Sequence, residues 1–269
     1  MKYLFLSIIA TGFLSSLAHG TESDAGKYRK CMSLVDSSAS EATIYATDWI
    51  LSGGGIPAGH CKALGLLGAG KAIEAANLLE KLVEDMAIKG NMNPDDAKKN
   101  AGLRVQLYAQ AALAWKEAGQ DDTSYYDKSY MAYSSALSAI VGDVFQSKRA
   151  LFHELYLARG TLQILRGQYK AAVEDFTLAI DKDSQQFEGF LQRAKAYRKR
   201  RMYMEARLDL KIAAKLEAAH PGILLESGIV FRAQEKKSEA RRVWQELIDL
   251  YPKSDYAALA RTNLDLLDL

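Results

Sequence analysis

Two cysteines are the side chains in this sequence with the clearest capacity for chemistry. Cys31 and Cys61 stand 30 positions apart in a chain of 269 residues. That spacing matches no metal-ligand motif, and no CxxC pair is present to indicate thiol–disulfide catalysis. An even number of cysteines behind an export signal favours a structural disulfide, and two buried free thiols are the alternative.

A glycine-rich segment at 65–72, GLLGAGKA, has the general look of a phosphate-binding loop. Position 72 is Ala, so the hydroxyl that would bind Mg²⁺ is missing. A strand should precede such a loop, whereas the residues after Pro57 predict a helix. We therefore do not expect nucleotide binding.

Other side chains that bind metals or perform catalysis are present but dispersed. The four histidines form no HxxxH or HExxH cluster, so zinc binding has weak support: His19, His60, His153 and His220. Residues 181–192 begin like a calcium loop, but Gln186 and Gln192 replace its glycine and its glutamate. Because no GxSxG element occurs either, we expect no catalytic site, no metal and no cofactor.

The composition excludes several broad classes of protein. Charged residues make up 25% of the chain, the net charge is only +2, and there are four prolines. Disordered chains and small disulfide scaffolds do not have this composition. A dedicated nucleic-acid binder would carry a strongly basic domain, so no nucleic-acid partner is expected.

The N-terminus predicts a cleaved signal peptide over residues 1–20. Lys2 is followed by an apolar stretch up to Leu14, and Ala18 and Gly20 supply the small residues that precede a cleavage site. An uncleaved membrane anchor would need about 20 apolar residues, which this stretch does not reach. We expect a mature protein without membrane insertion, periplasmic or secreted, and a bacterial periplasm is the simplest location.

An internal repeat in the sequence indicates which helices position these side chains. Three windows of 34 residues align without a gap, at 153–186, 187–220 and 221–254. Each position is named by its place in the window. Position eight is small, position twenty is Ala and position twenty-four is large and apolar: Gly160, Ala194 and Gly228; Ala172, Ala206 and Ala240; Phe176, Leu210 and Trp244.

This pattern describes two antiparallel helices that cross closely at their small residues. One such pair cannot bury its own apolar face, so neighbouring pairs must stack. The pattern resembles the tetratricopeptide repeat (TPR) family, most clearly in Tyr156–Ala179. The resemblance implies an all-α, right-handed solenoid. Proline is expected near position thirty-two, where only the last window has it, at Pro252.

Less regular windows extend the resemblance upstream, at 56–89 and at 105–146, the second with an insertion near 121–128. About five helix pairs are therefore expected. Residues 21–55 predict an N-terminal helical segment, and Asn93 and Pro94 predict the start of a helix that runs to Ala118. Residues 255–269 predict one amphipathic helix that caps the stack.

The resemblance also implies a binding surface, because the first helices of TPR pairs line a concave groove. Positions two, five, nine, twelve and thirteen should face this groove. The candidates include Leu191, Lys195, Arg198, Lys199, Ile229 and Arg232. The cations among them suit an acidic peptide or a terminal carboxylate. An ordinary solvated helix face is the alternative.

By analogy with the family, the function expected is that of a non-enzymatic scaffold that binds a protein or peptide in its groove. A structural subunit of an envelope assembly is one alternative. A peptidoglycan or glycan binder is another, suggested by the tyrosines at 125, 126, 130 and 133. The identity of the partner and the oligomeric state stay open.

Overall fold

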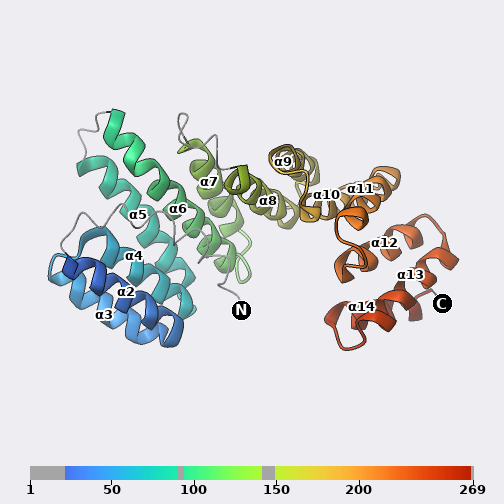
Figure 1. Ribbon diagram of the computed structural model, residues 1–269, viewed down its shortest axis with the longest axis horizontal. Helices are drawn as coiled ribbons and strands as arrows, with labels where there is room; N and C mark the ends of the chain where they lie inside the picture. Colours follow the sequence, from blue (N-terminus) through green and yellow to red (C-terminus); the bar gives the residue numbers. More distant parts are fainter. Residues whose placement is uncertain (1–21, 90–93, 141–148, 268–269) are drawn as a thin grey trace. The chain divides into compact units, whose positions relative to one another are not determined.

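The computed structural model describes residues 22–89, 94–140 and 149–267 (Figure 1), and these residues form thirteen α-helices and no strand. The expected all-α fold of TPR-like helix pairs is confirmed. The predicted signal peptide, residues 1–20, lies outside the described residues. None of the described helices is long and apolar enough to cross a membrane. The chain divides into two compact units, residues 1–147 and 148–269, which are treated separately below.

The first unit begins with two helices that precede the predicted repeats. Its described helices are α2 (Glu22–Ser37), α3 (Ala39–Leu51), α4 (Gly55–Gly68), α5 (Ala72–Lys89), α6 (Pro94–Ala118) and α7 (Tyr125–Ser138). Each packs on the next from α2 to α7, and α2 also contacts α4. Helix α6 has the two ends that the sequence predicts. Helix α7 begins inside the predicted insertion, and residues 141–146 lie outside the described part.

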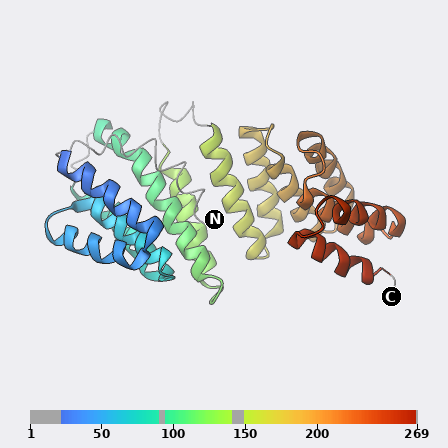
Figure 2. The same ribbon diagram turned by 60° about the horizontal axis from the view of Figure 1, so that its bottom comes forward.

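The second unit is a run of antiparallel helix pairs closed by a single helix (Figure 2). Its helices are α8 (Arg149–Leu165), α9 (Tyr169–Lys182), α10 (Phe187–Lys199), α11 (Tyr203–Leu216), α12 (Pro221–Ala233), α13 (Lys237–Leu250) and α14 (Asp255–Asp265). The second helices of the pairs begin 34 residues apart, at Tyr169, Tyr203 and Lys237. Helix α14 packs on α12 and α13 and buries Ala257 and Ala260.

The small residue at position eight is matched in size to the large residue at position twenty-four. A Cβ added to Gly160 would lie 2.7 Å from the Phe176 ring, and one added to Gly228 would lie 2.2 Å from Trp244. In the middle repeat Ala194 occupies position eight, and the side chain at position twenty-four is the smaller Leu210. The residues at these two positions therefore change volume in opposite directions among the three repeats, as close packing requires.

Gly228→Ala is expected to lower the free energy of unfolding by about 1–3 kcal/mol, because Trp244 must move out of its packed position. In a Trp244→Leu background the same change should become neutral or stabilising, since it recreates the Ala194–Leu210 pair of the middle repeat. Urea unfolding of the four proteins of this cycle measures the coupling.

Gly26→Ala is the matched control, because Gly26 lies in α2 with no atom near its added Cβ. It should gain up to about 1 kcal/mol from helix propensity alone. Equal effects of Gly228→Ala with Trp and with Leu at position 244 would show that the two sites are not coupled by volume.

In four of the helix pairs the turn uses a left-handed residue at position fifteen of the window. Gly167 takes this position with φ 72° in the third window, and Arg201 and Glu235 take it with φ 61° and 62°. Gly70, with φ 77°, does the same in the window 56–89. The left-handed region costs a residue with a Cβ roughly 1–2 kcal/mol, which glycine avoids.

Arg201→Gly is accordingly expected to stabilise the second unit by about 1 kcal/mol, although it removes a long side chain from the surface. Arg200→Gly is the control, because Arg200 is equally exposed but has φ −86°. Thermal unfolding followed by circular dichroism should raise the midpoint for Arg201→Gly and lower it for Arg200→Gly. An unchanged or lower midpoint for Arg201→Gly would contradict the expected strain.

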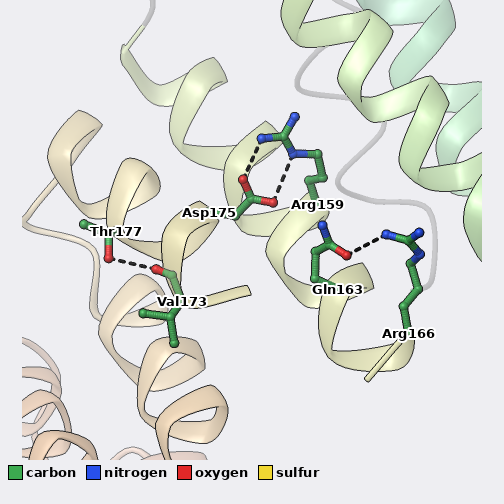
Figure 3. Close-up of polar contacts among 6 residues, drawn as sticks. All are labelled: Arg159, Gln163, Arg166, Val173, Asp175 and Thr177. Carbon is green, nitrogen blue, oxygen red and sulfur yellow. Dashed lines mark hydrogen bonds and ion pairs between the residues drawn. The ribbon is translucent and has the colours of Figure 1, made fainter. Parts of the chain in front are cut away.

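Each of two repeats also holds its helices together with an arginine–carboxylate pair. Arg159 on α8 donates from Nε and Nη2 to Asp175 on α9, at 3.0 and 2.6 Å (Figure 3). Arg193 makes the same two contacts with Asp209, both at 2.8 Å. Both carboxylates are buried. These are positions seven and twenty-three, where the last repeat has Ser227 and Val243 instead. The pairs are therefore a feature of the third and fourth windows.

Candidate interaction surface

The first helices of three successive repeats lie side by side in the second unit. Helix α8 contacts α10, and α10 contacts α12. Between residues 149 and 267 no comparable contact joins α9 to α11 or α11 to α13. The layer of first helices is thus the more closely spaced one, and its outward-facing residues form a shared surface. We call this the first-helix surface, made by α8, α10 and α12.

One of the predicted cations of this surface, Arg198, is paired with a buried carboxylate. Arg198 on α10 donates from Nε to Oε1 of Glu226 on α12, and from Nη2 to Oε2 at 3.3 Å. Glu226 is only 4% exposed. The contact links two neighbouring repeats and satisfies much of the hydrogen-bonding capacity of Arg198. Arg198 therefore serves mainly to join α10 to α12. Glu226 lies at position six of its window, outside the positions expected to face the groove, so the repeat pattern gives no signal for it.

Lys195 and Lys199 are the other two cations that the sequence placed on α10. Burial lowers the pKa of Lys195, and Arg198 adds to this effect, whereas Glu226 opposes it. A partly desolvated ammonium gains more from a carboxylate ligand than a fully hydrated one does. Lys199, one turn further along, is exposed. The two lysines therefore offer positive charge at the C-terminal end of α10.

The remaining predicted contacts occupy less accessible places. Leu191 is 4% exposed and belongs to the core between the fourth and fifth repeats, so it supports the surface from beneath. Ile229 is half-buried against the core of the last repeat. The guanidinium of Arg232 lies over the ring of Trp244, 5.8 Å from its centroid. The structure brings Lys195 and Arg198 together around Glu226, and it places Arg232 on α12 beside Trp244.

The opposite end of the first-helix surface is acidic. Glu154 on α8 and Glu188 on α10 stand at position two of their windows, and they interact electrostatically. Burial raises the pKa of Glu154, Glu188 raises it further, and His153 opposes this change. Oε2 of Glu188 is buried, and no hydrogen-bond partner for it occurs among the described residues. A positive group of a partner would be favoured at this end.

The first unit uses its cysteines and its buried histidine to attach α2. Cys31 and Cys61 are joined in a disulfide, which links α2 to α4. Beside it, Tyr28 Oη lies 2.8 Å from Nδ1 of His60, and Nε2 of His60 lies 2.7 Å from Oε1 of Gln110 on α6. Because an amide oxygen only accepts, Nε2 carries the proton and Nδ1 accepts from Tyr28. Three helices therefore meet at one neutral imidazole.

Three of the tyrosines near the insertion, Tyr125, Tyr126 and Tyr133, are engaged in packing. The rings of Trp115 and Tyr125 stack with centroids 5.3 Å apart, and Lys128 lies 4.3 Å from the Trp115 centroid. Tyr126 packs over Gly119, and Tyr133 is buried. No observation here favours a glycan-binding platform. Among the described residues no group of three or more His, Cys, Asp or Glu side chains is arranged to hold a metal ion.

No protein-family model matches this chain, and no curated protein sequence matches it. Solved structures do match. The MamA fragment from Desulfovibrio magneticus RS-1 has 12% sequence identity and a TM-score of 0.54, over 72% of this chain and 93% of that one. A second MamA crystal structure has 10% identity and a TM-score of 0.53, over 70% and 92%. YrrB, described as a TPR protein with an unusual peptide-binding site, has 16% identity and a TM-score of 0.52, over 76% and 91%.

Identities this low carry information about the fold alone. The agreement covers most of both chains. This chain is therefore similar in fold to tetratricopeptide repeat proteins.

Proposed function

We propose that this chain is an exported, non-enzymatic interaction protein that binds a segment of another protein across the first-helix surface. The single observation that carries the proposal is the polarity of this surface. Glu154 and Glu188, at position two of their windows, lie at one end of the surface, and Lys195 and Lys199 lie at the other. About ten residues of helix, roughly 15 Å, separate the two ends.

This separation suits an extended peptide that carries charges of both signs. A basic side chain of the ligand would lie beside Glu154 and Glu188, where a buried carboxylate oxygen lacks a partner. An acidic side chain or a terminal carboxylate would lie beside Lys195 and Lys199. Peptide binding by YrrB supports the choice of ligand class, because its fold is similar. The half-buried Ile229, at the same position nine as Lys195, supplies apolar contact at the basic end.

Lys195→Glu/Lys199→Glu tests this function and retains both Arg198 and Glu226, whose contact joins α10 to α12. In cells that produce the native chain, crosslinking followed by mass spectrometry should identify a partner segment. A synthetic peptide of that segment should bind the double variant at least about tenfold more weakly, since each reversed charge places like charges together. Lys170→Glu/Lys253→Glu is the control, because both lysines are exposed and lie outside α8, α10 and α12.

Equal loss of binding in both double variants would indicate non-specific attraction. Unchanged binding in the Lys195 and Lys199 variant would reject the first-helix surface. It would favour the alternative of a structural envelope subunit that assembles through other faces. Export is tested separately: cell fractionation and N-terminal sequencing should recover a periplasmic or secreted chain that begins at residue 21.

A further inference from the structure

Helix α11 carries an exposed row of apolar side chains that its own fold does not require. Met204, Leu208 and Ile212 follow one another at intervals of four residues, and their exposed fractions are 61%, 61% and 39%. Side chains four apart on a helix lie on one face, so the three form a continuous row about 12 Å long. The opposite face of α11 buries Ala206, Leu210 and Ala213 in the core. We call the three exposed residues the apolar row.

The neighbouring repeats show that this row is not a structural requirement. The same positions, eighteen, twenty-two and twenty-six, hold Lys170, Glu174 and Leu178 on α9. On α13 they hold Ser238, Arg242 and Glu246. Those helices occupy the equivalent place in their repeats with mainly polar residues there. An exposed apolar cluster with no role in folding marks an interaction site.

A second row runs beside the apolar row on the same helix. Arg207, Lys211 and Lys215 are also spaced by four residues, and we call them the cationic row. Lys211 and Lys215 are exposed, and the guanidinium of Arg207 lies 5.5 Å from the ring centroid of Phe231. On the other flank of the apolar row stands Glu205, which is exposed. Positive charge thus lies along one side of the apolar row only.

We propose that α11 docks an amphipathic helix of a partner protein, whose apolar row lies beside a row of Glu or Asp. Ridges of side chains at intervals of four pack between the corresponding ridges of a second helix, and the acidic row then meets Lys211 and Lys215. A lipid surface fits less well, because an anionic membrane would also meet Glu205. This second surface is independent of the proposed peptide function, because α11 is not one of the helices that form the first-helix surface.

A designed peptide probe tests the complementarity on the full mature chain. The probe is a fluorescein-labelled 21-residue helix with Leu on one face and a row of Glu beside it, and its partner probe has Lys in place of Glu. Fluorescence anisotropy should show at least about tenfold tighter binding of the Glu probe. Met204→Ser/Leu208→Arg/Ile212→Glu should weaken that binding at least about tenfold, because it installs the residues of α13 and leaves the net charge unchanged.

Leu250→Arg/Leu259→Glu is the matched control, since it replaces two other exposed leucines of the same unit and also leaves the net charge unchanged. Its binding should equal that of the unaltered chain. Equal affinity for the Glu and Lys probes, or equal binding by the triple variant, overturns the proposal. A third result would also overturn it: the chain binds neither peptide but binds vesicles of phosphatidylglycerol and phosphatidylcholine, and the triple substitution abolishes the vesicle binding. The face would then dock lipid. A dimer in sedimentation that the triple substitution dissociates would instead assign the face to a second copy.

Discussion

Loss of the Cys31–Cys61 disulfide is expected to lower the free energy of unfolding of the first unit by about 3–4 kcal/mol. The bond closes a loop between residues separated by 30 positions. In the chain-entropy description a loop of this size restricts the unfolded chain by about that amount. The bond also attaches α2, a helix that precedes the repeats, and both cysteines are fully buried.

Cys31→Ala/Cys61→Ala is the variant of choice, because it leaves no free thiol. Guanidinium unfolding should show the loss, and hydrogen exchange should show α2 losing protection before α12. Cys31→Ala alone is the comparison variant, because it also lacks the crosslink but keeps the buried Cys61 thiol. A similar loss of unfolding free energy in both variants would assign the effect to the crosslink and not to the buried thiol. Two titratable thiols in the native protein, with no change in gel mobility on reduction, would mean that the bond does not form.

Acid is expected to destabilise the first unit between pH 6.5 and 4 by up to about 3 kcal/mol, through His60. Burial lowers the pKa of His60 to about 4, and the hydrogen bond with Gln110 opposes this change. In the unfolded chain the pKa is about 6.5. Between these values the unfolded chain binds one more proton than the folded one, so the free energy of unfolding decreases as the pH falls.

The geometry supports the same direction. A proton on Nδ1 would displace the hydrogen bond that His60 accepts from Tyr28 Oη, and burial raises the pKa of Tyr28, which keeps this hydroxyl a donor. His60→Gln should be less stable at neutral pH but should lose less stability towards pH 4. Unfolding in a Trp244→Phe background, followed by Trp49 and Trp115, reports on this unit. Parallel pH profiles of the two proteins would contradict the role of His60.

Much of the architecture is readable from the sequence, because it depends on residue volumes at a fixed period. Two helices can cross closely only where small residues stand, so small residues at positions eight and twenty mark the crossing, and the pairs Gly160–Phe176 and Gly228–Trp244 follow from spacing. The start of α6 at Pro94 follows from the lack of an amide hydrogen in proline. Such rules act within one repeat and need no information on how neighbouring repeats pack.

Two features of the second unit had a sequence signal that the volume pattern did not reveal. Arg159 and Arg193 are 34 residues apart, as are their partners Asp175 and Asp209. A search for charges that repeat in register would have found these pairs. The apolar row of α11 was equally visible, because Met204, Leu208 and Ile212 differ from the residues at the same positions of the repeats on either side.

The tertiary structure alone decides which predicted surface residues are accessible to a partner. The sequence places Leu191, Lys195 and Arg198 on one helix, but it does not show that Leu191 is covered or that Glu226 takes up Arg198. Both facts depend on how α12 packs against α10, and therefore on distances between side chains that are 28 or more residues apart. By itself the sequence determined the helical pairs and their register, because those follow from local periodicity. Packing between repeats decided which charged side chains remain accessible to a partner, since burial and ion pairing depend on neighbouring residues that the repeat pattern does not specify.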